Sequence, residues 1–91
     1  MSPTESVMRG LTPEQVLIIA DQLDQPVRNY AGIVALAAAS AAQIQGIPVH
    51  TDSRRAAAAL RELALATAPL RAENDVFAEV LARVFLDIQE I

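Results

Sequence analysis

The chain has 91 residues, 53% of them hydrophobic and 20% charged, which predicts one folded domain rather than two domains or a disordered chain. With no cysteine and a single histidine, His50, the composition excludes a disulfide scaffold, a thiolate zinc site and any multi-histidine metal site. A net charge of −4, with seven basic residues that are all arginine, makes the chain a poor general binder of nucleic-acid phosphates.

Residues 1–10 are expected to form a flexible lead-in. They lack the basic flank and apolar run of a secretory signal, so we expect a cytoplasmic protein. A first helix is predicted from Thr12 as N-cap, with Pro13 in the first helical position and Gln15 completing a capping box. It should end before Pro26, because the residue preceding a proline disfavours helical angles. Its apolar positions are Val16, Leu17, Ile19, Ala20 and Leu23.

A second helix is predicted from an Asn29 N-cap to Gly46. Residues 30–42 carry no charge, which favours a central core helix, too short for a membrane span of about 20 apolar residues. Ser40 is expected to be a core serine that bonds its own helix backbone. The alternative is that the small side chains face another chain, as a candidate interface. That interface comprises Tyr30, Ala31, Ala35, Ala38, Ala39 and Ala42.

A third helix is predicted to begin at a cap formed by Thr51, Asp52 or Ser53 and to end near residues 67–69. Its inner stripe should consist of alanine and leucine, with arginine pointing outward. The stripe is Ala56, Leu60, Leu63 and Ala64. The outward residues Arg54, Arg55 and Arg61 are the only candidates for contacts with nucleic acid.

A fourth helix should follow a connector at residues 70–74, capped by Asn74 or Asp75. Glu79 and Arg83 are spaced for an intrahelical ion pair. The broad apolar face comprises Val76, Phe77, Val80, Leu81, Val84, Phe85 and Ile88. The fold class predicted from these elements is all-α, a compact single-domain bundle of about four helices spanning residues 11–91.

Catalytic groups are sparse. His50 and Asp52 lie two residues apart and could serve as an acid–base pair, although a surface loop histidine is the simpler interpretation. The acidic residues do not recur at metal-binding spacings, and no glycine-rich phosphate loop is present. We therefore expect no metal and no cofactor.

Residues 68–76 read Ala-Pro-Leu-Arg-Ala-Glu-Asn-Asp-Val. This run resembles the signature of the Fic/Doc (filamentation and death-on-curing) family, His-Pro-Phe, two variable residues, then Gly-Asn-x-Arg. Pro69 and Asn74 match, Leu70 keeps the apolar character of the family's Phe, and residues 84–86 repeat a Val-Phe-Leu found in the next helix of that family. Residues 11–17, 26–29 and 54–58 resemble further family segments in the same order, so the resemblance spans roughly residues 11–88 and implies a Fic/Doc-like fold.

The departures from that signature concern its chemistry. Ala68 stands where the family has its general base, Glu73 replaces the glycine that cradles phosphate, and Val76 replaces the phosphate-binding arginine. The resemblance therefore implies a degenerate member without catalytic activity. We expect such a protein to bind a protein partner or a second copy of itself, in a toxin–antitoxin module if the family relation holds.

Two further readings stay open at this stage. One is an unrelated small helical dimerisation or regulatory domain, in one version a DNA-binding one. The other is an active enzyme that uses His50 and Asp52.

Overall fold

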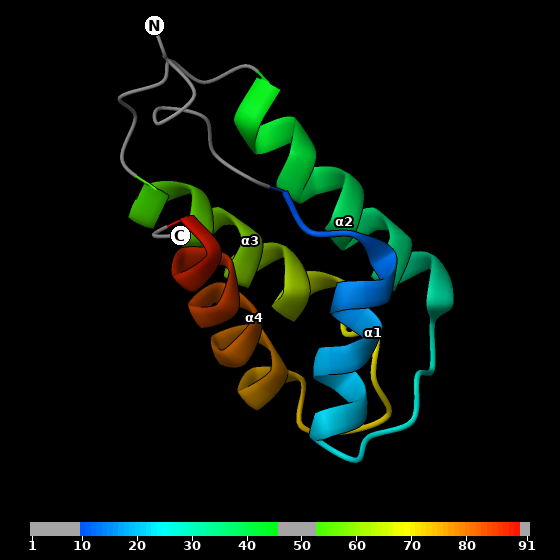
Figure 1. Cartoon of the computed structure of the whole chain (residues 1–91). Helices are drawn as coiled ribbons and strands as arrows, with labels where there is room; N and C mark the ends of the chain where they lie inside the picture. Colours follow the sequence, from blue (N-terminus) through cyan, green and yellow to red (C-terminus); the bar gives the residue numbers. More distant parts are fainter. Residues whose placement is uncertain (1–9, 46–52, 90–91) are drawn as a thin grey trace, which may run out of the picture.

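A computed structural model describes residues 10–45 and 53–89 and shows them as four α-helices (Figure 1). The helices are α1 (Pro13–Gln22), α2 (Tyr30–Gln45), α3 (Ser53–Thr67) and α4 (Asn74–Gln89). Within these residues the only β contact is an isolated antiparallel bridge between Val27 and Leu70. The prediction of an all-α fold is confirmed for this part of the chain. The predicted lead-in, apart from Gly10, and the predicted loop with His50 and Asp52 lie outside the described residues.

The four helices pack in a ring, each against two neighbours. α3 and α4 form an antiparallel hairpin with the largest contact, α2 packs on α3, and α1 closes the ring against α2 and α4 (Figure 1). Ala57 and Ala64 of α3 and Ala78 of α4 are buried. Their small side chains let the two helix backbones approach closely.

The core combines aliphatic residues with both phenylalanines of the chain. Phe77 and Phe85 of α4 are fully buried, together with Leu36 of α2, Leu60 of α3 and Val16 of α1. The core is therefore not purely aliphatic, although aromatic residues make up only 3% of the chain. Full burial of one such side chain contributes about 1.5–3 kcal/mol to stability, so these residues hold the ring together.

Local signals predicted the first two helix starts correctly. The Thr12 side chain accepts a hydrogen bond from the Gln15 amide at 3.1 Å, and the Gln15 side chain accepts one from the Thr12 amide at 2.9 Å. The Asn29 side chain accepts a hydrogen bond from the Gly32 amide at 3.3 Å, which caps α2. Both caps satisfy amides that a helix start leaves without an intrahelical partner.

The predicted cap of the last helix is wrong. Glu73 precedes α4 with φ 58°, and its carbonyl accepts the hydrogen bond of the Phe77 amide at 2.9 Å. Asn74 is already helical, and its side chain bonds Leu70 instead. Val76 does not belong to the buried apolar face that was predicted, because its side chain is 41% exposed in the first turn of the helix.

The predicted ion pair within α4 is replaced by one between helices. The Glu79 carboxylate lies 3.4 Å from Nε of Arg61 on α3. Because α3 and α4 pack closely, a partner on the facing helix is as near as one a turn away on the same helix. Such exposed pairs contribute about 0–1 kcal/mol.

The interpretation of α2 as a central core helix is wrong. α2 forms one side of the ring, with Ile33, Leu36 and Ala37 facing inward and Tyr30 and Val34 exposed. In a ring of four short helices, every helix keeps an outer side. The absence of charge on α2 therefore did not signal burial all round.

Candidate functional site

Two loops that are far apart in the sequence lie side by side at one end of the molecule (Figure 1). We call residues 24–29 and 68–74 the paired loops. The Pro69 carbonyl accepts hydrogen bonds from the amides of Arg28 at 2.8 Å and Asn29 at 3.0 Å, and the Arg71 amide donates to the Pro26 carbonyl at 3.0 Å. Main-chain hydrogen bonds thus hold together the segment that resembles the Fic/Doc signature and the loop between α1 and α2.

Ala68, at the position of the family's general base, ends α3. Its φ of 44° lies in the left-handed region, and its amide donates to the Ala64 carbonyl at 3.0 Å. The Arg28 guanidinium donates to the Ala68 carbonyl at 2.9 Å. The methyl side chain has no group that could move a proton, so Ala68 contributes a helix end and a carbonyl acceptor.

Pro69 and Asn74, the two residues that match the signature, stabilise the turn. The Asn74 side chain accepts a hydrogen bond from the Leu70 amide at 3.0 Å and donates one to the Leu70 carbonyl at 3.1 Å. Pro69 packs on the first turn of α2, where a Cβ placed on Gly32 would lie 3.1 Å from the Pro69 Cβ. The turn therefore uses both residues for its own geometry.

Of the remaining signature positions, Leu70 is fully buried in the core, and the others lie at the surface. Glu73 and Val76 are exposed, as is Asp75 in the first turn of α4. Carboxylates near a helix N-terminus interact favourably with the helix dipole. They would also repel a phosphate from the position where the signature family binds one.

The candidate interface on α2 is largely accessible. Tyr30 is 56% exposed, and Ala31, Ala35 and Ala38 are exposed as well, whereas Ala39 is half-buried against the core. The side chain of Ala42 lies outside the described residues. The structure adds two exposed residues that the sequence analysis missed, Val34 and Ala41, although their spacing of three to four residues from the others could have revealed them. We define the outer face of α2 as Tyr30, Ala31, Val34, Ala35, Ala38 and Ala41.

Ser40 is a buried structural residue, as predicted, but it does more than bond its own helix. Its Oγ donates to the Ala37 carbonyl at 2.7 Å and accepts a hydrogen bond from the Leu11 amide at 2.8 Å. Gly10 lies against the same turn, since a Cβ added to it would be 3.2 Å from the Ala41 backbone. In the part of the chain that the structure describes, no buried side-chain polar atom lacks a hydrogen-bond partner.

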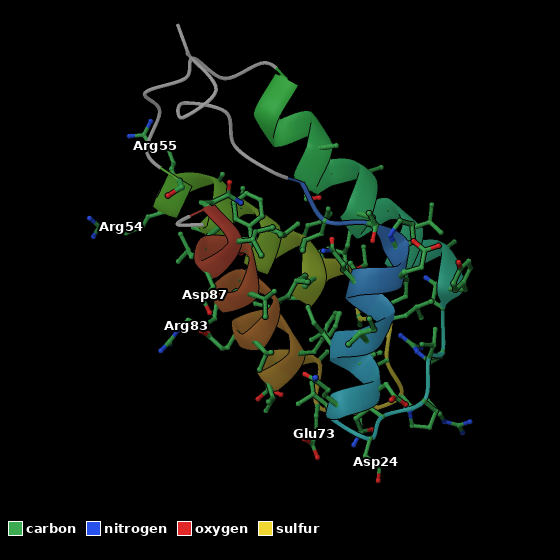
Figure 2. All side chains as sticks on the ribbon, viewed as in Figure 1. Asp24, Arg54, Arg55, Glu73, Arg83 and Asp87 are labelled. Carbon is green, nitrogen blue, oxygen red and sulfur yellow. The ribbon has the colours of Figure 1, made fainter. Side chains whose placement is uncertain are left out.

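Acidic and basic side chains are mixed on the paired loops, which carry Arg28 and Arg71 as well as acidic residues. Arg54 and Arg55 lie at the start of α3, while Asp24 and Glu73 lie at the opposite end, on the paired loops (Figure 2). Arg61 is engaged by Glu79, so it is not a free cation for nucleic acid.

Among the described residues, no group of three or more acidic or histidine side chains could hold a metal ion. In the same residues, no helix combines the length and hydrophobicity needed to cross a bilayer.

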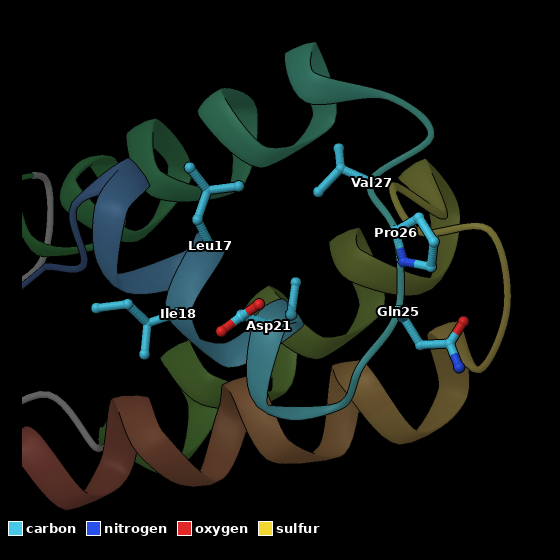
Figure 3. A pocket seen from close by; sticks show the side chains of 7 residues that line it. Leu17, Ile18, Asp21, Gln25, Pro26 and Val27 are labelled. Atoms are coloured by element: carbon cyan, nitrogen blue, oxygen red, sulfur yellow. The ribbon is translucent and has the colours of Figure 1, made fainter.

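A groove lies between α1 and the loop that follows it (Figure 3). Its volume is about 460 Å³. A second hollow of about 200 Å³, lined by Asp21, Asp24, Gln25 and Pro26, shares three of its residues. We call this groove the α1 groove; its lining is Leu17, Ile18, Ala20, Asp21, Gln25, Pro26 and Val27.

Comparison with protein-family models, with curated proteins and with solved structures finds no match to this chain. The fold and the surface therefore define only a class of protein. The chain is a small all-α protein with four helices in its described part and no charged residue on the outer face of α2.

Proposed function

We propose that this chain is a non-catalytic helical protein that acts by binding a protein partner through the outer face of α2. One observation carries the proposal: a regular helix presents an accessible face without a single charged residue. Its alanines allow a second helix to approach closely, and Tyr30 and Val34 add larger apolar contacts at one end. Exposed apolar surface of this kind is typical of interaction sites.

The non-catalytic part of the proposal is supported by the turn at residues 68–74. Ala68 offers no proton-transfer group, and Asn74 is occupied by the main chain of Leu70. Glu73 adds negative charge where a nucleotide phosphate would have to bind. Each of these features favours a structural role for the turn.

The relation to the Fic/Doc family forms part of the same proposal. It is supported by the order of the matching segments in the sequence and by the location of residues 68–74 between two helices, as that resemblance implies. Under this relation the chain is a degenerate member, and the expected partner is the helical segment of a small antitoxin in a toxin–antitoxin module.

A native pull-down of the tagged chain, with the mass of the intact complex determined, tests the proposal. The decisive comparison uses Ala35→Glu on the outer face of α2 and the matched control Ala58→Glu on an exposed position of α3. We expect a stoichiometric partner with the parent chain and with Ala58→Glu, and its loss with Ala35→Glu. A complex that survives Ala35→Glu unchanged, with both variants folded by circular dichroism, would contradict the proposal.

A further inference from the structure

We infer that the α1 groove is a second binding site, which takes a peptide segment of a partner protein carrying a basic side chain between aliphatic ones. This site shares no residue with the outer face of α2, so binding at the groove can be tested independently of the proposed function.

The walls of the groove are apolar. Leu17 and Ile18 come from α1, and Pro26 and Val27 from the loop on the other side (Figure 3). Ile18 is 55% exposed, so its side chain is accessible to a ligand in the groove. A volume of about 460 Å³ lies within the range of binding pockets in proteins. The walls therefore favour aliphatic side chains.

The charge of the groove has one sign. Asp21 lines both hollows and Asp24 lines the smaller one, while no arginine lines either. Neither carboxylate forms a salt bridge with any residue that the structure describes. A third carboxylate is near, because Oε2 of Glu73 lies 3.5 Å from the side-chain Nε2 of Gln25, which lines the groove. This arrangement attracts a cation and repels phosphate and acidic peptides.

Asp21 and Asp24 lie at the C-terminal end of α1, where the helix dipole also favours a cation. The last turn of α1 holds no basic residue, although the negative end of a helix dipole favours one. Asp21 and Asp24 thus lie at the end of α1 where their charges are least favourable to the helix itself. A bound cationic side chain would compensate both the carboxylates and the helix end.

The groove is also held in shape before any ligand binds. The Gln25 amide donates to the Ala20 carbonyl at 3.3 Å, which fixes the loop to α1. The paired loops fix the other side through the hydrogen bond of the Arg71 amide to Pro26 and the bridge of Val27 to Leu70. Arg28, the basic residue that follows Val27, is engaged by the Ala68 carbonyl. A preformed site loses less conformational entropy on binding.

Titration of the ¹⁵N-labelled full chain, followed by amide chemical shifts, tests this inference. The probe is the peptide acetyl-Leu-Arg-Leu-Arg-Leu-amide, and the controls are acetyl-Leu-Glu-Leu-Glu-Leu-amide and acetyl-Ser-Arg-Ser-Arg-Ser-amide. We expect saturable shifts at Ile18, Asp21 and Val27 with the first peptide and much weaker ones with both controls. Equal responses to the glutamate peptide, or shifts confined to other helices, would overturn the inference.

A pair of variants separates this site from general attraction to an acidic protein. Asp21→Asn should weaken binding about two- to fivefold, the effect of losing one exposed ion pair. Asp87→Asn removes the same charge from an exposed position on α4 and should leave binding unchanged (Figure 2). Equal weakening by both variants would overturn the inference. Groove shifts that depend on protein concentration without peptide would also overturn it, because a second copy would then be the occupant.

Discussion

The hydroxyl of Ser40, in the middle of α2, accepts a hydrogen bond from the main-chain amide of Leu11 at 2.8 Å. The two residues are 29 positions apart, and both are buried. This bond fixes the chain just before α1 against α2, and so helps to set the angle at which α1 enters the ring.

Replacing Ser40 with alanine should destabilise the protein by about 1–3 kcal/mol, the cost of leaving a buried amide without a partner. Urea denaturation followed by circular dichroism measures the change. Ala41→Ser places a hydroxyl one residue further on, at an exposed position, and should change stability by less than about 0.5 kcal/mol. Equal stability of Ser40→Ala and the parent would show that the Leu11 amide finds another partner.

Asn74→Ala should cost about 1–3 kcal/mol, because it removes two hydrogen bonds to the Leu70 main chain at about 0.5–1.5 kcal/mol each. The measurement is again denaturant unfolding, with Ala72→Ser at an exposed position of the same turn as control. If Asn74 served a ligand instead of the turn, its replacement would leave the free energy of unfolding unchanged.

Ala68→Gly should stabilise the protein by up to about 1 kcal/mol. Ala68 has φ 44°, a left-handed conformation that costs a residue with a Cβ about 1–2 kcal/mol and costs glycine little. Ala66→Gly, within α3, is the matched control and should destabilise by about 1 kcal/mol. A lower melting temperature for Ala68→Gly would mean that the alanine methyl makes a contact worth more than the backbone strain.

Neither the parent chain nor Ala68→His should transfer AMP or phosphate. Restoring an imidazole returns a general base, but Glu73 and Val76 still leave the phosphate without the glycine and arginine that the Fic/Doc signature provides. Incubation with ATP labelled on the α- or γ-phosphate, in the presence of candidate target proteins, measures this. Label transfer by the parent chain that is abolished by Asn74→Ala would contradict the non-catalytic proposal.

Local signals in the sequence were sufficient for the starts of the first two helices. The capping box at Thr12 and the cap at Asn29 act through neighbours three residues away, so the pattern and the structure agree there. The inward stripe of α3 was also recognisable, since Ala56, Leu60 and Ala64 are all buried.

The sequence was a poorer guide wherever distant segments meet. The hydrogen bond of Leu11 to Ser40 and the bridge of Val27 to Leu70 have no local signature. The α1 groove depends on how the loop folds back on α1, so its lining could not be deduced from helix periodicity. On α2, alanine is apolar enough to suggest burial yet small enough to be exposed at little cost, and the exposed outer face could therefore not be distinguished from a core face.

The contact between the paired loops consists mostly of main-chain hydrogen bonds. This affects which of the loop residues can be replaced during evolution. Substitutions at Arg71 or Ala72 leave the hydrogen bonds of the Pro69 carbonyl and the Arg71 amide in place. Gly32 is different, because any larger residue would press on Pro69. A descendant of this chain could thus change the side chains at positions 71 and 72 and still keep the two loops joined at the same place.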